Sequence, residues 1–270
     1  MSLSPMHTYQ RSATEYPELA GRVAVVTGAA QGMGACFASG LARQGVNVFS
    51  VDVISEALNQ TVQTSQSDNS DIERRPGSIS AFPADVSSRT DMHRVAEHVI
   101  KRCGRLDIWV NNAGIFPQSE IAAVSQEQLD KTFGVNVDGV FFGTQAAAAQ
   151  MAHGGAIVNM ASVAAVRVRK LRAVYSASKA AVQHLTSSLA VELGGAGIRV
   201  NALAPGFINT EMTNWVRETP GATEKALASI PLGRIGEPSE VLSALLFLVS
   251  DSASYISGHT LAVDGGSRHG

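Results

Sequence analysis

Cysteine is scarce in this sequence, and neither sign of charge is in excess. The two cysteines among 270 residues, Cys36 and Cys103, lack the spacing of a metal site. Both fall in segments with a helical pattern, so we expect buried free thiols in a reducing compartment. The 21 basic and 23 acidic residues give a net charge of −2. Such a balance excludes the basic surface of a typical nucleic-acid-binding protein.

Long hydrophobic runs are missing as well. The longest, residues 241–249, is too short to span a bilayer. The N-terminal residues lack the basic-then-apolar pattern of a secretory signal. We interpret the histidines as surface or packing residues and expect no catalytic metal, because they show no metal-ligand spacing: His7, His93, His98, His153, His184, His259 and His269. These absences predict a cytoplasmic enzyme that contacts neither nucleic acid nor membrane.

Short β-branched runs alternate with amphipathic stretches from residue 22 onward. The runs predict seven strands, at 23–26, 46–51, 79–82, 106–110, 156–160, 198–203 and 260–263. The first five are almost continuously apolar, which indicates burial on both faces. Helical patterns lie between them, at 33–44, 55–65, 88–103, 126–151, 173–194 and 238–249. The alternation predicts an α/β fold: a single doubly wound domain, residues 21–270, with a parallel sheet flanked by helices.

Three stretches depart from this alternation. Residues 1–20 have little periodicity, and we expect a tail that packs loosely or contacts a neighbouring subunit. The polar residues 66–78 predict a surface connection at the sheet edge. Residues 207–231 follow the sixth strand, where ligands bind in such sheets, so we interpret them as a substrate lid, with a variable loop as the alternative. The lid offers three apolar side chains and one charge: Met212, Trp215, Val216 and Arg217.

A glycine-rich segment directly follows the first predicted strand. Without Cβ atoms the backbone can turn tightly and approach a pyrophosphate at a helix N-terminus, and the glycines concerned are Gly28, Gly32 and Gly34. Asp52 ends the second strand, where a carboxylate accepts hydrogen bonds from ribose hydroxyls and repels a 2′-phosphate. Neither Gln31 nor Val53 is a cation that would bind that phosphate. The sequence therefore predicts NAD(H) rather than NADP(H).

Two further strand ends bear polar or small residues. Asp85 and Val86 follow the third strand, where an acceptor would bind the adenine amino group. A helix N-cap formed by Asp85 or Ser87 is an alternative that is compatible with this role. Residues 111–114, Asn-Asn-Ala-Gly, follow the fourth strand and would let a cofactor approach closely, with an ordinary turn as the alternative.

Ser162, Tyr175 and Lys179 suggest proton transfer beside that nucleotide site. A free phenol has a pKa of about 10, too high for efficient proton exchange near neutrality. Lys179 lies one helical turn beyond Tyr175, so its charge favours the phenolate and its ammonium group can bind the nicotinamide ribose. Ser162 can donate a hydrogen bond to the substrate oxygen. We therefore predict Tyr175 as the general acid/base of a hydride-transfer enzyme.

The sequence resembles the short-chain dehydrogenase/reductase family over roughly residues 20–266. The motifs that carry the resemblance occur in the family's order: the segment 27–34, Asp52, 111–114, Ser162, Tyr175-x-x-x-Lys179 and Pro205-Gly206. The resemblance implies a single Rossmann-type domain and commonly a homotetramer, in which the helices at 126–151 and 173–194 form an interface. It implies a cofactor site that includes Gln31, Met33, Asn112, Ala113, Gly114, Tyr175, Lys179, Pro205 and Gly206, with Ile208 and Thr210 flanking the nicotinamide carboxamide. Asn136 matches a fourth catalytic residue, at a helix kink whose bound water continues a proton relay. A helix-interior polar contact is the alternative.

Four cations lie between Ser162 and Tyr175: Arg167, Arg169, Lys170 and Arg172. They predict recognition of an anionic substrate group, with a solvated rim or ion pairs to a neighbouring subunit as the simpler expectation.

Residues 201–206 and 263–266 are similar to family members that oxidise sugar alcohols and other secondary alcohols, and equally to those that reduce 3-oxoacyl thioesters. Asp52 predicts NAD(H) as the cofactor, and cellular NAD⁺ pools usually favour oxidation of the substrate. Asp52 therefore favours oxidation as the direction of the reaction. We therefore predict an NAD(H)-dependent oxidoreductase that interconverts a secondary alcohol, polyols included, and its ketone. A reductase of 3-oxoacyl thioesters on a carrier protein or CoA is the alternative. A non-catalytic NAD-binding sensor is a remote one, because Ser162, Tyr175 and Lys179 are all present.

Overall fold

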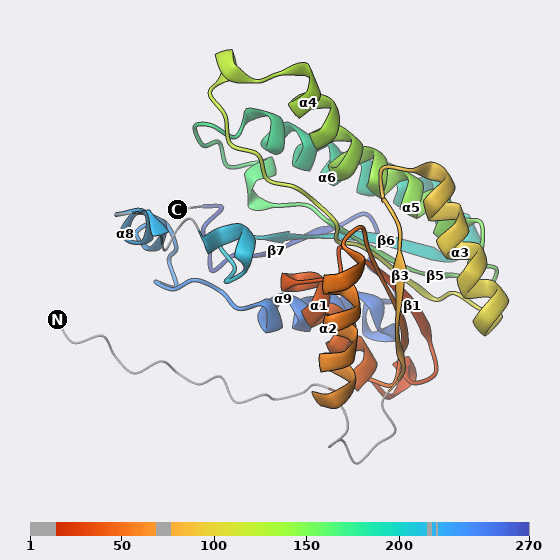
Figure 1. Cartoon of the computed structure of the whole chain (residues 1–270). Coiled ribbons are helices and arrows are strands. Elements are labelled where there is room, and N and C mark those ends of the chain that lie inside the picture. Colours follow the sequence, from red (N-terminus) through yellow and green to blue (C-terminus); the bar gives the residue numbers. More distant parts are fainter. Residues whose placement is uncertain (1–14, 69–76, 215–217, 220, 270) are drawn as a thin grey trace.

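A seven-stranded, wholly parallel sheet forms the centre of the molecule (Figure 1). The computed structural model describes residues 15–68, 77–214, 218–219 and 221–269. The strands are β1 (Val23–Thr27), β2 (Asn47–Asp52), β3 (Ile79–Pro83), β4 (Ile108–Asn111), β5 (Gly155–Met160), β6 (Ile198–Pro205) and β7 (Thr260–Val263). Their spatial order is β3-β2-β1-β4-β5-β6-β7. The predicted doubly wound, Rossmann-type sheet is therefore confirmed.

Helices cover both faces of the sheet (Figure 1). One layer consists of α1 (Gly32–Arg43), α2 (Ser55–Asp68) and α9 (Pro238–Val249). The other consists of α3 (Arg89–Cys103), α4 (Gln126–Phe133), α5 (Gly139–Ala148) and α6 (Ala173–Leu193). The short helix α8 (Ala222–Leu227) lies at the periphery, near the C-terminus. Two apolar cores result, one on each face, and both draw on the buried strands β1, β2 and β4.

The reversal of strand order between β1 and β4 opens a crevice at the carboxyl ends of the strands. Side-chain hydrogen bonds tie the two strand ends together. Thr27 Oγ1 accepts from the backbone N–H groups of Asn112 and Ala113, at 3.0 and 3.1 Å. Asn112 Nδ2 donates in return to the carbonyls of Thr27 and Gly28, at 2.9 and 3.0 Å. The glycine-rich turn is therefore fixed against the turn that follows β4.

The N-terminal prediction is wrong in part. Pro17–Leu19 form a single 3₁₀ turn, and Leu19 is fully buried in the core beside α1. Tyr16 N–H donates to Gln44 Oε1 at 2.9 Å. Loose packing up to residue 20 is thus excluded, because a buried leucine ties the segment down. Residues 1–14 lie outside the described residues.

Three smaller expectations also need correction. Helix α2 continues to Asp68, into the predicted surface connection at 66–78, of which residues 69–76 lie outside the described part of the chain. The N-cap of α3 is Ser88, whose hydroxyl accepts from Asp91 N–H, rather than Asp85 or Ser87. Cys36 and Cys103 are free thiols on helices, but they are half-buried rather than buried. No helix that the structure describes is long and apolar enough to cross a bilayer.

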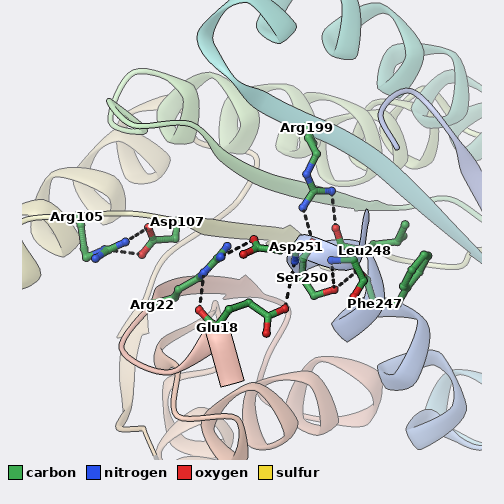
Figure 2. Close-up of polar contacts among 10 residues, drawn as sticks. Glu18, Arg22, Arg105, Asp107, Arg199, Phe247, Leu248, Ser250 and Asp251 are labelled. Atoms are coloured by element: carbon green, nitrogen blue, oxygen red, sulfur yellow. Dashed lines mark hydrogen bonds and ion pairs between the residues drawn. The ribbon is translucent and has the colours of Figure 1, made fainter. Parts of the chain in front are cut away.

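The amino ends of the strands carry a network of polar contacts (Figure 2). Arg22 pairs with Asp251 at 2.7 Å, and its Nε donates to Glu18 O at 3.0 Å. Arg105 forms a bidentate pair with Asp107, at 2.9 and 2.7 Å. A further arginine donates to two carbonyls near the end of α9, namely Arg199 to Leu248 O and Ser250 O, at 2.7 and 3.1 Å.

Candidate active site

Two adjoining cavities occupy the carboxyl ends of the strands. The larger has a volume of about 590 Å³ and the smaller about 110 Å³. They share five lining residues: Met33, Asn112, Gly114, Thr210 and Met212. A ligand that fills the larger cavity would therefore reach the side chains of the smaller one.

The larger cavity brings together most of the predicted cofactor residues. Its lining includes Gly28, Gln31, Gly32, Met33, Gly34, Asp52, Asp85, Val86, Asn112, Ala113, Gly114 and Thr210. Sequence reasoning missed several further lining residues: Ile54, Ala84, Ile115, Lys131, Val135 and Glu211. Most of them directly adjoin a predicted residue, so extending each strand-end motif by one position would have found them. Lys131, on α4, offered no such signal.

The glycine-rich turn is packed so closely that two of its positions have no room for a side chain. Gly28 has a φ of +65°, and a Cβ there would lie 2.7 Å from Ala113 Cα. A Cβ on Gly34 would collide with the carbonyl oxygen of Gly28. At the N-cap of α1, Gln31 makes no side-chain capping bond, so the first N–H groups of this 12-residue helix are left to other acceptors. The segment therefore fits a phosphate group at a helix N-terminus.

Asp52 is held at the end of β2 by backbone donors. Its Oδ2 accepts from Ala30 N–H at 3.0 Å, and its Oδ1 from Ile54 N–H at 3.1 Å. Val53 and Ile54 beside it are exposed at the cavity. Asp85 also lines this cavity, and its Oδ1 accepts from both the N–H and the hydroxyl of Ser87, at 2.9 and 2.7 Å. Both carboxylates are thus oriented before a ligand arrives.

The smaller cavity brings together Ser162, Tyr175 and Lys179. Tyr175 and Lys179 lie on one face of α6, and their side chains are only 8% and 4% exposed. Lys179 Nζ donates to Met160 O at 2.7 Å and lies 5.9 Å from the centre of the Tyr175 ring. Phe116 packs edge-on against that ring, with 4.6 Å between centroids. The hydroxyl of Ser162 is close enough to Tyr175 to lower the pKa of its phenol.

The electrostatics of this trio differ from those expected. Burial raises the pKa of Tyr175, while the hydrogen bond from Ser162 and the charge of Arg172 oppose that rise. Arg172 is thus a cation near Tyr175 that the sequence spacing did not indicate. Burial lowers the pKa of Lys179 to about 8, because the ammonium is withdrawn from water.

Asn136 lies where the predicted helix 126–151 is interrupted. A π-helical turn, Gly134–Asp138, separates α4 from α5 and turns the fully buried Asn136 side chain toward the loop after β4. Its Oδ1 accepts from Ile115 N–H at 2.8 Å, and its Nδ2 donates to Ile115 O and Ser178 Oγ, both at 3.0 Å. Both Asn136 Oδ1 and Lys179 Nζ crowd the site where Gly114 would carry a Cβ, at 3.3 and 3.4 Å. Asn136 therefore joins the loop after β4 to α6, close to Lys179, and its role in a proton relay stays a prediction.

The segment after β6 closes the smaller cavity. Four residues that were predicted for the cofactor site line it: Pro205, Gly206, Ile208 and Thr210. Phe116, Phe207 and Ser267 line it too, and none of them belongs to a motif recognised in the sequence. Of the expected lid residues, Met212 lines both cavities, whereas Trp215, Val216 and Arg217 lie outside the described residues. Within the described residues, no group of three or more His, Cys, Asp or Glu side chains is placed to hold a metal ion.

Comparison with known proteins agrees with this geometry. The family described as enoyl-(acyl carrier protein) reductase matches residues 28–268. The 3-oxoacyl-(acyl-carrier-protein) reductase FabG of Thermotoga maritima is 39% identical over 250 residues, which is 92% of this chain and 98% of that protein. A cyclopentanol dehydrogenase of Comamonas sp. is 38% identical over 247 residues, covering 91% of this chain and 96% of that protein.

Solved structures are similar across the same length. A short-chain type dehydrogenase/reductase from Mycobacterium ulcerans has a TM-score of 0.88 and 31% identity, covering 92% of this chain and 90% of that one. A protein from Beutenbergia cavernae, described as an NAD(P)-dependent gluconate 5-dehydrogenase, holds NADP at low occupancy; it has a TM-score of 0.84 and 36% identity, covering 92% and 97%. The chain is therefore a member of the short-chain dehydrogenase/reductase family and an oxidoreductase.

Proposed function

We propose that this protein interconverts a secondary alcohol and its ketone with NAD(H), and that Tyr175 is the general acid/base. The observation that carries the proposal is the junction of the two cavities. A glycine-lined cleft fit for a dinucleotide adjoins, through Asn112 and Gly114, the cavity that Ser162 and Tyr175 line. Among its relatives, the cyclopentanol dehydrogenase of Comamonas sp. acts on a secondary alcohol.

The larger cavity supports the cofactor assignment. Gly28, Gly32 and Gly34 would admit the pyrophosphate, and Asp52 would accept the ribose hydroxyls. Asp85 and Val86 would lie at the adenine, and Ile208 and Thr210 at the nicotinamide. A nicotinamide dinucleotide bound here supplies the hydride acceptor or donor. The chain itself supplies orientation and proton transfer.

Proton transfer follows from the smaller cavity. In the oxidation direction, Tyr175 Oη accepts the proton of the substrate hydroxyl, and Ser162 Oγ donates a hydrogen bond to the same oxygen. In the reduction direction Tyr175 returns the proton. Lys179, a helical turn away, favours the phenolate when it is protonated. Asn136 acts beside Lys179, and its bonds to Ile115 fix the loop that borders the site.

The proposal extends to organisation and assembly. Residues 21–270 form one catalytic domain with the lid at 207–231, and the protein is a cytoplasmic homotetramer. Two apolar side chains on the predicted interface helices support association: Phe141 on α5 is 39% exposed and Val191 on α6 is 84% exposed. Apolar surface of this kind suits contact with another subunit. Light scattering that found a monomer would overturn the tetramer.

The experiment that tests the function is NADH formation at 340 nm with a panel of secondary alcohols, polyols and hydroxyacids. We expect turnover of at least one secondary alcohol. The second candidate, reduction of 3-oxoacyl thioesters, is favoured by the relative from Thermotoga maritima. Acetoacetyl-CoA and a 3-oxoacyl carrier protein, assayed with NADH and NADPH, separate the two. A thioester preference over every alcohol and simple ketone would replace the first assignment with the second.

Cofactor choice is tested at Asp52. We expect a higher kcat/KM with NAD(H) than with NADP(H), and we expect Asp52→Ala to narrow the difference by about tenfold, since about 1.4 kcal/mol of repulsion corresponds to that factor. Glu56→Ala, which removes a carboxylate from the first turn of α2, is the control for charge alone. A wild-type preference for NADP(H) would contradict the assignment.

A further inference from the structure

The loop that joins β5 to α6 turns its arginines inward. Arg167, Arg169 and Arg172 are half-buried and line the smaller cavity. Val168 on the same loop is 91% exposed and Leu171 is 46% exposed. Aliphatic side chains usually face the interior and arginine the solvent, so the order here is reversed. Such a reversal is unfavourable for stability and therefore suggests a ligand for the arginines.

Specific contacts hold the loop in this orientation. Leu171 has a φ of 66°, the one positive φ of a non-glycine residue in the described ranges. A backbone of this kind costs on the order of 1–3 kcal/mol and persists only where its surroundings enforce it. The Leu171 carbonyl accepts from Ser119 N–H at 3.0 Å. Arg167 and Arg169 donate to Ser229 O and Oγ, at 3.3 and 3.1 Å. The arginines are thus positioned by segments on two sides of the cavity.

Aromatic rings orient two of the guanidinium groups. Arg172 lies over the Phe116 ring at 4.8 Å, and Phe116 packs against Tyr175. Arg169 lies over the Phe207 ring at 4.7 Å. Stacking occupies the face of a guanidinium and directs hydrogen bonds to its edge, the geometry that recognises a carboxylate or phosphate. The rings therefore place two guanidinium edges near the reacting hydroxyls.

The charges in this cavity are of one sign. The described residues that line it include four cationic side chains and no Asp or Glu. The cations are Arg167, Arg169, Arg172 and Lys179. Burial lowers the pKa of Arg169, and the charge of the neighbouring Arg167 lowers it further. The pKa of Arg172 is lowered in the same way, by burial and then by the charge of Arg169. An anion in the cavity would relieve this repulsion.

We propose that the substrate is a small secondary alcohol or ketone that carries a terminal oxyanion, and that Arg169 and Arg172 bind this group. The proposal rests on the proposed function, because Ser162 and Tyr175 hold the reacting oxygen of the same molecule. Carboxylate, sulfonate and phosphate share the required chemistry. A small molecule is favoured over the acidic surface of a carrier protein, because the arginines face a cavity and not the outer surface.

Matched substrates test the proposal without any mutation. The probes are 3-hydroxybutyrate and its uncharged methyl ester, with 2-hydroxypropanesulfonate and 2-hydroxypropyl phosphate as the other two oxyanions. We expect kcat/KM for at least one anion to exceed that for the ester by about tenfold or more, the usual gain from a charge-assisted hydrogen bond. The anion with the largest ratio identifies the group. Equal values for all anions and the ester would overturn the proposal.

Two variants locate the effect. Arg169→Gln should lower kcat/KM for the preferred anion, through KM, by about tenfold or more relative to kcat/KM for the methyl ester. Lys170→Gln removes the same charge from the same loop, but its side chain is exposed and does not line the cavity, so both substrates should be unaffected. Unchanged melting temperatures confirm that both variants fold. Equal losses in the two variants would indicate a diffuse field and overturn the proposal.

A non-reacting probe separates failure of this proposal from failure of the proposed function. 3-Hydroxy-3-methylbutyrate is a tertiary alcohol and cannot be oxidised to a ketone. In the presence of NAD⁺ it should raise the melting temperature of the wild type more than that of Arg169→Gln. If no alcohol is turned over and this difference remains, the anion site stands and the reaction assignment falls. Arginine-dependent activity confined to a 3-oxoacyl carrier protein would assign the arginines to a protein partner instead, against the proposal.

Discussion

The two ends of the parallel sheet use arginine in opposite ways. Around the amino ends each arginine of the network meets an acceptor: Asp251 for Arg22, Asp107 for Arg105, and two backbone carbonyls for Arg199 (Figure 2). Around the carboxyl ends the arginines of the β5–α6 loop line a cavity whose described lining contains no carboxylate. The same side chain thus ties segments together at one end and lines a cavity at the other.

Other features separate the two ends in the same direction. The carboxyl end holds Lys179 in a site where burial lowers its pKa to about 8, and the strained backbone of Leu171. Each feature costs stability, and such costs persist at functional sites because the chemistry requires them. The amino end shows complementary charges instead. We therefore expect changes at the carboxyl end to alter activity most, and changes at the amino end to alter stability slightly.

Tyr175→Phe is expected to produce the largest effect. Without the hydroxyl no group of the chain exchanges the substrate proton, so kcat should fall by about 10³-fold or more. NADH binding, followed by fluorescence, should persist, because the ring and its contact with Phe116 remain. Tyr255→Phe makes the same chemical change at a fully exposed position and should leave kcat unchanged. Substantial turnover by Tyr175→Phe would exclude the mechanism.

Much of the fold could be predicted because burial in a parallel sheet leaves a local pattern. The apolar runs that mark β1 and β4 are buried along their whole length, so alternation of strand and helix identified the sheet. Gly28 and Gly34 were equally readable, since the requirement for a missing Cβ is local. The seven strands were found for this reason, with boundaries that differ by only a few residues.

The substrate side of the site could not be predicted, because its geometry depends on distant contacts. The inward direction of Arg167 and Arg169 requires Ser229, and the conformation of Leu171 requires Ser119. A run of cations has the same sequence pattern whether it faces solvent or a cavity. The simpler expectation of a solvated rim is wrong for the three arginines, because they are half-buried and line a cavity. The pKa of Tyr175 likewise depends on burial that its spacing from Lys179 does not reveal.

Lys179→Met tests whether the buried lysine at the carboxyl end destabilises the folded protein. We expect an effect of a few kcal/mol on the free energy of unfolding. The unfolded lysine has a pKa of about 10.4, and burial lowers it to about 8 in the folded protein. Between these values the unfolded chain binds more protons, so wild-type stability should rise with pH from 8 to 10.4. The rise should approach about 3 kcal/mol, and it should vanish in Lys179→Met. Activity should be lost at every pH.

Urea unfolding of both proteins between pH 7 and 10.5 measures this difference. At pH 7 the variant gains from losing a buried charge but leaves Met160 O without its donor, at a cost of about 1–3 kcal/mol. The pH dependence of the difference is therefore more informative than its value at one pH. Lys101→Met replaces an exposed lysine of α3 and controls for the loss of charge. A pH-independent difference between wild type and Lys179→Met would contradict the expected burial penalty.

Arg22→Gln is expected to produce the smallest effect, and it tests the amino end. The Arg22 side chain is 22% exposed and that of Asp251 is 66% exposed, so water screens their 2.7 Å pair. Unfolding free energy should fall by about 1 kcal/mol or less, and by less still at high salt. A double-mutant cycle with Asp251→Asn isolates the pair from the bond to Glu18. Because the whole length of the strands separates this pair from the cavities, kcat/KM should not change. A change of about tenfold would show that the two ends are coupled, and the division of labour drawn from their arginines would be wrong.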